Sequence, residues 1–323
     1  MTDQLTAPWI WLEAETTDTM FVRARKSFEL DRLPDSTELL ITSCGLYRFW
    51  VNGEFAGRGP ARSLPHRKRY DVIDIAPYLR EGSNTLAVSI VRFGYSTGLV
   101  AEAWGAFWCQ LEGVEPRVQT DETWRMSIDP CYDVKAARRN GNYGIVEIFD
   151  GRKEDGWREP DYDDTDWQDA ILLGDHRSGR ATPQMAPWTA MIRRGVEQCA
   201  EDEVLPQAVT LVGEVENQEF QPPMELPWYL ALDVPQELEY AEVEGAENLL
   251  DPNAGPMVIT QPSPLDRSEP HQRCATVIVD FGRELDAFGR IDVEGNEGAV
   301  VDVVYGERLI GGRVQPVVQG TGY

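Results

Sequence analysis

The sequence is poor in the residues that metal sites, disulfide frameworks and nucleic-acid interfaces require. It has only three histidines, none with a second histidine nearby, and five cysteines that form no C-x-x-C pair. This pattern favours neither a local zinc site nor a disulfide framework, and it suits a reducing compartment. There are 30 Lys and Arg against 55 Asp and Glu, which gives a formal net charge of −25. Such a balance argues against general DNA or RNA binding, which needs a basic surface to replace phosphate counterions.

Long apolar runs are also absent. No stretch approaches the ~18 consecutive apolar residues of a membrane span, and the N-terminal segment shows neither a basic start nor an apolar run. We therefore expect a cytoplasmic protein that has neither a membrane nor nucleic acid as a partner. The 42% hydrophobic and 10% aromatic residues are sufficient for a packed core, which excludes wholesale disorder.

The acidic residues are unevenly distributed along the chain. Residues 1–200 carry 24 basic and 31 acidic side chains, whereas residues 201–323 carry 6 and 24. A length of 323 residues is about two domains' worth at ~100–200 residues per domain. We place the first domain at 8–175, a linker rich in turn-forming residues at 176–200, and the second domain at 201–323.

Short runs of β-branched and aromatic residues alternate with turn signals through the first domain. The pair Asn52-Gly53 separates two such runs and can occupy both positive-φ positions of a type I′ hairpin turn. Residues 85–91 alternate with period two, and a helical turn is expected at 74–79. The strands follow one another too closely for intervening helices of ~10–15 residues, which disfavours a parallel α/β fold. The sequence predicts an antiparallel β-sandwich of the jelly-roll, galactose-binding-like type.

The second domain is also predicted to be β structure. A Pro- and Gly-rich stretch at 249–267 is expected to form a long loop between strands. The candidate strands are 209–215, 228–234, 275–281, 290–294 and 299–305. Five strands make a thin sandwich with an open edge, so we expect this sandwich to be incomplete at its C-terminus. The predicted fold class is therefore all-β, with two antiparallel β-sandwich domains.

Three early motifs occur in a recognisable order. They are G-L-Y-x-x-x-V-N-G at 45–53, Y-D-x-x-D-I at 70–75 and G-x-N-x-L-A-V at 82–88. This order resembles the sugar-binding-type jelly roll at the front of large glycoside hydrolases. Beta-galactosidase-type enzymes share a looser version of it.

Four later stretches narrow the resemblance. They contain W-R-M and D-P within 124–130, E-I-F-D-G-R at 147–152, Y-D-D-T-D-W at 162–167 and D-F-G-R-E at 280–284. In this order they resemble bacterial alpha-L-rhamnosidases of glycoside hydrolase family 78. The resemblance implies two β-sandwich domains in front of a helical (α/α)6 catalytic barrel, so we expect a helical catalytic domain downstream of this chain. The implied parent reaction is the hydrolysis of terminal alpha-L-rhamnosides, with this portion binding or positioning carbohydrate or bracing the barrel.

An acidic stretch at 161–166 is the candidate metal site. Asp161, Asp163 and Asp164 could gather carboxylates around a calcium ion. The stretch lacks the Gly and the terminal Glu of an EF-hand loop. An Asx turn that leads into a strand, with Trp167 in the core, is the simpler interpretation. We therefore predict no cofactor and keep calcium as the alternative.

Carbohydrate is the predicted partner, and rhamnose-containing glycans are the class implied by the resemblance. Aromatic rings hold neutral sugars by stacking, and the candidates are Tyr95 and Trp104, with Arg92 close enough to add hydrogen bonds. Trp108 lies four residues beyond Trp104, which would place both on one face, and a core role is the alternative for each. In the basic cluster at 58–69, Arg62 could present its guanidinium to sugar hydroxyls. The alternative is a solvated loop that balances nearby acidic residues.

Paired carboxylates were weighed because glycosidases need two, about 5–10 Å apart. The sequence-close pairs are Glu147/Asp150 and Glu154/Asp155. In a chain with 55 acidic residues such pairs arise by chance, and no apolar pocket can be inferred that would raise one pKa. We predict no catalytic residue in this chain and no glycosidase activity from the chain alone. A free-standing carbohydrate-binding or adhesion module and the front end of a beta-galactosidase-type enzyme remain alternative functions.

Overall fold

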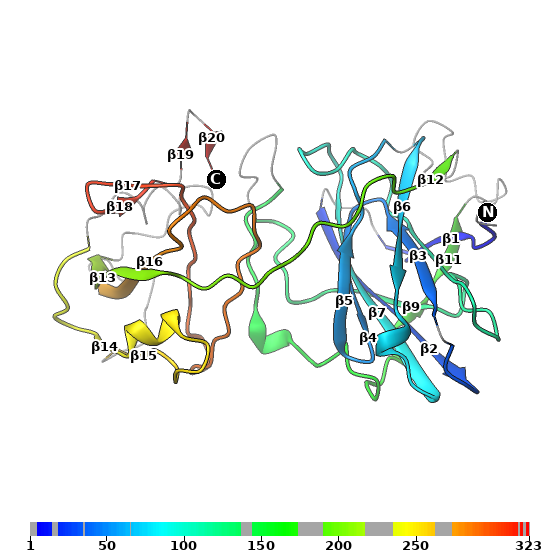
Figure 1. Cartoon of the computed structure of the whole chain (residues 1–323), viewed down its shortest axis with the longest axis horizontal. Coiled ribbons are helices and arrows are strands. Elements are labelled where there is room, and N and C mark those ends of the chain that lie inside the picture. Colours follow the sequence, from blue (N-terminus) through cyan, green and yellow to red (C-terminus); the bar gives the residue numbers. More distant parts are fainter. Residues whose placement is uncertain are drawn as a thin grey trace. The chain divides into compact units, whose positions relative to one another are not determined.

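The computed structural model describes residues 5–14, 19–34, 36–64, 66–136, 144–173, 190–216, 235–261, 273–315, 317–318 and 321–322. The chain divides into two compact units, Met1–Gln198 and Cys199–Tyr323. Strands and short 3-10 turns are the regular structure of the described residues, which contain no α-helix (Figure 1). The predicted all-β fold class is confirmed.

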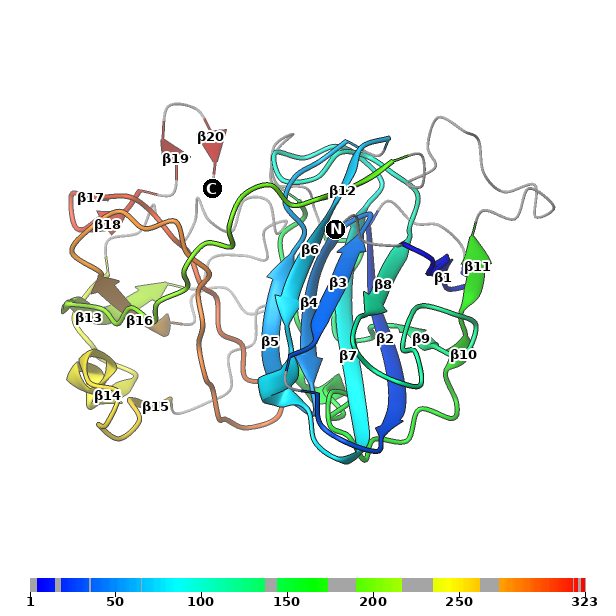
Figure 2. The same ribbon diagram turned by 45° about the vertical axis from the view of Figure 1, so that its right-hand side comes forward.

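The first unit is a β-sandwich of two six-stranded sheets (Figures 1 and 2). The first sheet has the strand order β11-β1-β8-β3-β6-β12, and the second has the order β10-β9-β2-β7-β4-β5. Every pair is antiparallel except β12, which runs parallel to β6. The strands are β1 (Trp9–Trp11), β2 (Thr19–Leu30), β3 (Glu38–Ser43), β4 (Leu46–Val51), β5 (Glu54–Gly59), β6 (Lys68–Asp74), β7 (Gly82–Phe93), β8 (Phe107–Leu111), β9 (Arg125–Ile128), β10 (Gln168–Asp169), β11 (Ile171–Leu173) and β12 (Met191–Arg193).

The hairpin between β4 and β5 forms as the sequence predicts. Asn52 has a φ of 54° and Gly53 a φ of 85°, the two positive values that a type I′ turn requires. Glycine is favoured at position 53 because its φ of 85° lies in the left-handed region that side chains disfavour. The expected helical turn is also confirmed as the 3-10 turn η1 (Ala76–Tyr78).

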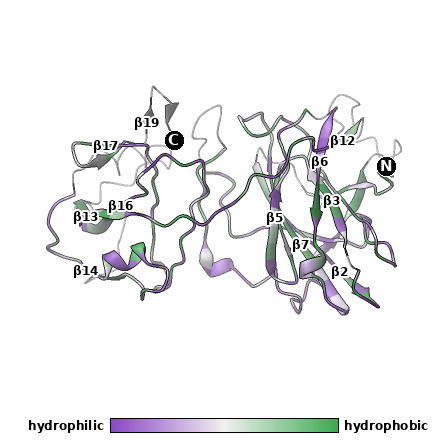
Figure 3. Ribbon diagram, viewed as in Figure 1, coloured by the Kyte–Doolittle hydropathy of each residue, from purple (hydrophilic) through white to green (hydrophobic). Residues whose placement is uncertain are grey.

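The main core lies between the two sheets. Leu86, Val88 and Ile90 of β7 point into it, as their period-two spacing predicts. Strand β3 is hydrophobic at Leu39, Leu40 and Ile41 (Figure 3) and buried from its second residue to its last. On the other face of β7, Ala87 packs with Trp50 and Trp157. Both faces of the second sheet are therefore covered.

The range predicted as a linker contains a strand. Residues 174–189, which include the turn-rich stretch at 176–187, lie outside the described residues. Residues Met191–Arg193 form β12 and pair with β6 at the edge of the first sheet. The C-terminal end of the range 176–200 is thus tied to the first unit by a sheet ladder.

In the second unit, the described residues form two-stranded antiparallel ribbons and one 3-10 turn. The predicted strands 209–215 and 275–281 are confirmed as the paired β13 and β16, with a register shift between Val209 and Leu211. The elements are β13 (Ala208–Glu216) with β16 (Arg273–Asp280), β14 (Glu242–Glu244) with β15 (Val258–Thr260), β17 (Leu309–Ile310) with β18 (Arg313–Val314), β19 (Val317–Val318) with β20 (Thr321–Gly322), and η4 (Ala246–Leu250).

Other expectations for this unit are corrected. The predicted strands 290–294 and 299–305 are wrong, because neither segment forms a ladder, and Ile291 and Val293 are 62% and 58% exposed. Alternation of apolar and polar residues is typical of a strand with one buried face. The segment forms a strand, however, only when a neighbouring strand supplies backbone hydrogen bonds. The predicted loop at 249–267 contains β15, and the predicted strand at 228–234 lies outside the described residues.

Candidate functional site

Three loops of the first unit leave its sheets at the same end. They join β3 to β4 (44–45), β5 to β6 (60–67) and β7 to β8 (94–106). The registers of β4 with β5 and β7, and of β3 with β8, bring the strand ends that flank these loops together. We call this the loop end. Binding residues commonly lie on loops that a rigid scaffold positions, and this end carries all four residues predicted to bind carbohydrate.

The loop 94–106 is held in shape by its own side chains. The hydroxyl of Thr97 accepts hydrogen bonds from the backbone N–H groups of Leu99 and Val100 at 3.1 and 3.0 Å. At the other end of the loop, a Cβ on Gly105 would lie 2.2 Å from Cε2 of Trp11. The loop therefore has a defined path and a closely packed base.

Three of the predicted residues belong to this loop or its root. Arg92 is buried, and its Nε donates to the carbonyl oxygen of Ala103 at 3.2 Å. Tyr95 is half-buried, with its ring 5.7 Å from that of Phe93. Trp104 is 39% exposed. Arg92 thus fixes the backbone next to Trp104, which is partly exposed.

The expectation that Trp104 and Trp108 share a face is corrected. Trp104 lies in the loop before β8, so strand periodicity does not relate the two residues. Trp108 is buried, and its Nε1 donates to the carbonyl oxygen of Ala7 at 2.8 Å. It packs in a second hydrophobic cluster with Trp9, Leu40 and others. Trp108 has the core role, and Trp104 is the accessible tryptophan of the pair.

Arg62 lies on the neighbouring loop 60–67 and is exposed. That loop is closed by a hydrogen bond from the backbone N–H of Arg67 to the carbonyl oxygen of Leu64 at 3.0 Å. The backbone N–H of Arg69 also donates to the hydroxyl of Ser63 at 3.2 Å. The guanidinium of Arg62 is therefore presented from a turn at the same end as Trp104.

Buried polar groups beneath the loop end were not found from the sequence. Lys68, the first residue of β6, is 4% exposed, and desolvation lowers its pKa. Burial raises the pKa of the Cys44 thiol to about 11, although the positive charges of Lys68 and Arg92 oppose the shift. Nothing in the sequence around Lys68 distinguishes it from its basic neighbours. Its burial follows from the position of β6 inside the first sheet, between β3 and β12.

Two of the three candidate calcium ligands are engaged in other contacts, and the third is exposed. Asp164 forms an ion pair with Arg25 at 2.9 Å. Asp163 accepts hydrogen bonds from the backbone and the hydroxyl of Thr165, which lower its pKa, and this is the Asx turn of the alternative interpretation. Asp161 is exposed. Within the described parts of the chain, no group of three His, Cys, Asp or Glu side chains is arranged to hold a metal ion.

Asp150, Glu154 and Asp155, three of the four carboxylates in the sequence-close pairs, have structural partners. Asp150 caps the 3-10 turn η2 (Gly151–Lys153), and its hydrogen bond with the Arg152 side chain is the largest of the interactions that lower its pKa to about 2. Asp155 binds Arg23 at 3.0 Å, and Glu154 binds Arg158 at 3.0 Å. Held ionised by Arg152, Asp150 is a poor proton donor at neutral pH.

Two buried arginines organise the outer face of the second sheet. Arg23 and Arg25 alternate with core residues on β2, and both are 1% exposed. Arg23 binds Asp129 at 2.8 Å, and Arg25 donates to the carbonyl oxygens of Trp157 and Glu159. These contacts fasten the segment 150–167 across the sheet. The sequence did not predict this arrangement.

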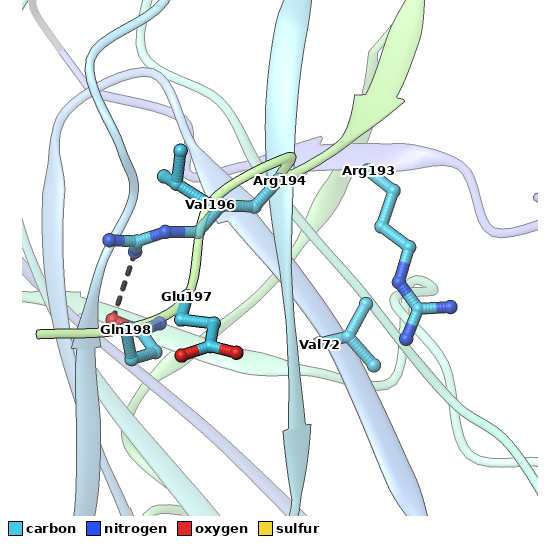
Figure 4. Close-up of a pocket in the computed structure, with 6 residues that line it drawn as sticks. All are labelled: Val72, Arg193, Arg194, Val196, Glu197 and Gln198. Atoms are coloured by element: carbon cyan, nitrogen blue, oxygen red, sulfur yellow. Dashed lines mark hydrogen bonds between the residues drawn. The ribbon is translucent and has the colours of Figure 1, made fainter.

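A small pocket lies where the chain leaves β12. Its volume is about 280 Å³, and it is lined by Val72, Arg193, Arg194, Val196, Glu197 and Gln198 (Figure 4). Within it, Arg194 donates to Oε1 of Gln198 at 2.9 Å and to Oδ1 of Asp71 at 3.0 Å. Arg194 thus holds this segment against β6 through Asp71.

The first unit is similar to a known protein domain. Residues 33–191 match the family model of the alpha-L-rhamnosidase N-terminal domain. The predicted resemblance to the N-terminal region of family 78 rhamnosidases is confirmed. Among the described residues, no helix is long and apolar enough to cross a membrane.

The rhamnosidase relatives are much longer than this chain. Two alpha-L-rhamnosidases from Formosa agariphila are 27% identical to it over 166 and 164 residues, which are 45% and 44% of this chain but 17% and 16% of theirs. The crystal structure of a GH78 family rhamnosidase from Bacillus sp. GL1 is similar over 77% of this chain and 24% of that one, with a TM-score of 0.59 and 26% identity. The chain therefore spans about one sixth of the curated relatives.

Proposed function

We propose that this chain is the non-catalytic N-terminal portion of an alpha-L-rhamnosidase-like glycoside hydrolase, and that its loop end binds or positions carbohydrate. The match of residues 33–191 to the rhamnosidase N-terminal domain carries the proposal. The relatives named as alpha-L-rhamnosidases support hydrolysis of terminal alpha-L-rhamnosides as the parent reaction. The acids for that reaction would come from the rest of the protein, which fits the arginine-bound carboxylates described above.

The loop end offers the two kinds of group that neutral sugars require. Trp104 provides a partly exposed ring on which sugar C–H groups can stack. The exposed Arg62 provides hydrogen-bond donors from the neighbouring loop. The role of Arg92 in this proposal is that of a positioning residue, because its Nε holds the backbone of Ala103. Calcium as an additional ligand of the first unit is kept as a hypothesis that the same titration tests.

Calorimetric titration of the chain with L-rhamnose, with and without calcium, tests the binding role. We expect saturable binding in the millimolar range, a strong loss in Trp104→Ala and a weaker loss in Arg62→Gln. Tyr240→Ala is the matched control, because Tyr240 is an exposed aromatic residue of the second unit. Absence of any binding at millimolar sugar would overturn the carbohydrate role and leave bracing of the rest of the protein as the function.

Hydrolysis of an aryl alpha-L-rhamnoside tests the non-catalytic assignment. We expect no turnover by the chain alone. Turnover that disappears in Glu147→Gln or Asp150→Asn would refute this assignment, because those two residues form one of the two sequence-close carboxylate pairs.

A further inference from the structure

A second group of side chains, on the outer face of β4 and β5, combines guanidinium groups with aromatic rings. The guanidinium carbons of Arg48 and Arg158 lie 6.0 and 5.3 Å from the centre of the Trp50 ring. That of Arg58 lies 5.1 Å from the Phe55 ring. The two rings meet edge to face, with centroids 5.9 Å apart. We call these five residues the arginine–aromatic cluster.

A β-bulge places Phe55 and Arg58 on the same face. Residues three apart on a regular strand point to opposite faces, because side chains alternate with period two. The register of β5 with β4 shifts by one residue at Ala56, and the additional residue restores a common face. Gly57 is required next to the bulge, since a Cβ there would lie 2.8 Å from Cε1 of Phe49. The backbone is thus shaped to bring this ring and this guanidinium together.

The cluster contains a like-charge pair. Arg48 and Arg58 lie directly opposite each other in the β4–β5 ladder, an arrangement that destabilises a sheet. Arg158 has its charge compensated by Glu154 at 3.0 Å. Arg48 is exposed and donates to the phenol oxygen of Tyr132 at 3.0 Å, a neutral partner. Arg48 and Arg58 therefore place two guanidinium groups side by side in a chain whose net charge is −25.

The chemistry of the cluster suits an acidic sugar. The Phe55 ring is 41% exposed and can accept the apolar face of a pyranose. Guanidinium groups bind carboxylates with paired, charge-assisted hydrogen bonds. We propose that the arginine–aromatic cluster is a second carbohydrate subsite, separate from Trp104, that takes a sugar unit carrying a carboxylate. The proposal rests on the carbohydrate-binding function proposed above, and it adds the substrate class: glycans that contain uronic acid units.

The experiment compares two ligands that differ only in charge. The full chain is titrated with trigalacturonate and with the same trisaccharide after reduction of its carboxyl groups, at 50 and 300 mM salt. We expect tighter binding of the acidic ligand by about tenfold at low salt, with the preference reduced at high salt. Arg48→Gln and Arg58→Gln should each weaken binding of the acid by about tenfold. Phe55→Ala should weaken binding of both ligands.

Matched variants keep the result interpretable. Arg152→Gln removes another exposed arginine, which binds Asp150, and should leave binding unchanged. Arg58→Lys retains the charge without the paired donors and should give an intermediate affinity. Equal affinity for the two ligands, or unchanged acid binding in both Arg48→Gln and Arg58→Gln, would overturn the subsite. Titration of the same variants with L-rhamnose separates the two proposals. If rhamnose binds and requires Trp104, but no uronate binds, only the proposed acidic-sugar subsite is overturned.

Discussion

Arg194 forms an ion pair with Asp71, a carboxylate whose side chain has no exposed surface. The Nη1 atom of Arg194 lies 3.0 Å from Oδ1, and the hydroxyl of Tyr47 donates to Oδ2 at 2.5 Å. Burial, followed by the charge of Asp71, raises the pKa of that phenol well above its ordinary value, so it stays a donor. Since Arg194 directly follows β12, the pair fastens the last segment of the first unit to the edge of its sandwich.

Substitution of Arg194 should therefore weaken the first unit. Arg194→Gln leaves the buried Asp71 carboxylate without its ion-pair partner, which costs about 3–5 kcal/mol for a pair of this kind. A loss of this size lowers the unfolding midpoint by roughly 6–20 °C in a unit of this length. Thermal unfolding followed by tryptophan fluorescence measures the change. Arg193→Gln is the control, because Arg193 is half-exposed and meets Glu38 at 3.4 Å, and it should shift the midpoint by less than about 2 °C. Equal shifts in both variants would contradict the structural role of Arg194.

Arg25 holds the segment 150–167 against the second sheet, and this contact can be tested without removing the positive charge. Arg25→Lys keeps the cation but cannot reach both the Asp164 carboxylate and the carbonyl oxygens of Trp157 and Glu159. We expect a loss of about 2–3 kcal/mol, because hydrogen bonds to a charged group are lost from a buried site. Limited proteolysis should cut first within 150–167, and Trp157 fluorescence should shift to the red. Arg117→Lys, an exposed residue that donates to Thr6, should leave the cleavage pattern as in the wild type.

Glu214 makes the second unit sensitive to acid. Its side chain is buried, and its Oε1 accepts hydrogen bonds from the backbone N–H groups of Tyr240 and Ala241 at 2.6 and 2.5 Å. Burial alone would raise the pKa of Glu214, but these donors and Arg273 together lower it. A carboxylate with a lowered native pKa contributes stability above its unfolded pKa and loses it as the pH falls through the native value.

Hydrogen exchange of β13 and β16 between pH 7 and pH 3 measures this effect, after correction for the intrinsic exchange rate. Protection should decline on acidification in the wild type. Glu214→Gln should be less protected at pH 7, by about 1–2 kcal/mol, and its protection should depend less on pH. Glu242→Gln, at an exposed position of β14, should follow the wild-type curve. A Glu214→Gln curve parallel to that of the wild type would show that another group causes the acid sensitivity.

Local signals explain which parts of the first unit could be predicted from the sequence. The Asn52-Gly53 turn depends on two residues that tolerate positive φ, and it formed as predicted. Arg92, Tyr95 and Trp104 are close in sequence, so their common loop required no long-range information. The pattern around Arg23 and Arg25 was misleading. Charges that alternate with apolar residues indicate a strand whose outer face is solvated, but both arginines are buried. The segment that buries them follows more than 120 residues later, and no local pattern encodes that contact.

The second unit also shows that a local sequence pattern does not determine which segments pair as strands. Segments 275–281 and 290–294 both have strand-like patterns, yet only the first pairs, with β13. Strand formation depends on a partner as much as on the pattern of the segment itself. In the first unit, Lys68 lies in a run of basic residues that predicts a solvated loop, but strand β6 starts at this residue and buries it.

The burial of Lys68 gives a prediction with a defined sign. Desolvation lowers its pKa relative to the unfolded chain, so the unfolded state binds more protons and stability rises with pH between the native and unfolded pKa values. Lys68→Met retains the length of the side chain and removes the charge. It should raise stability at pH 7 by about 1 kcal/mol and the unfolding midpoint by roughly 2–4 °C. The difference between the two proteins should shrink as the pH rises toward about 10.5, because the wild-type lysine then begins to lose its proton in the unfolded state as well. Urea unfolding at pH 7, 9 and 10.5 measures this difference in stability.

Lys153→Met, at an exposed position, is the control. A less stable Lys68→Met at pH 7 would mean that the ammonium group makes a favourable contact beneath the loop end that outweighs its desolvation.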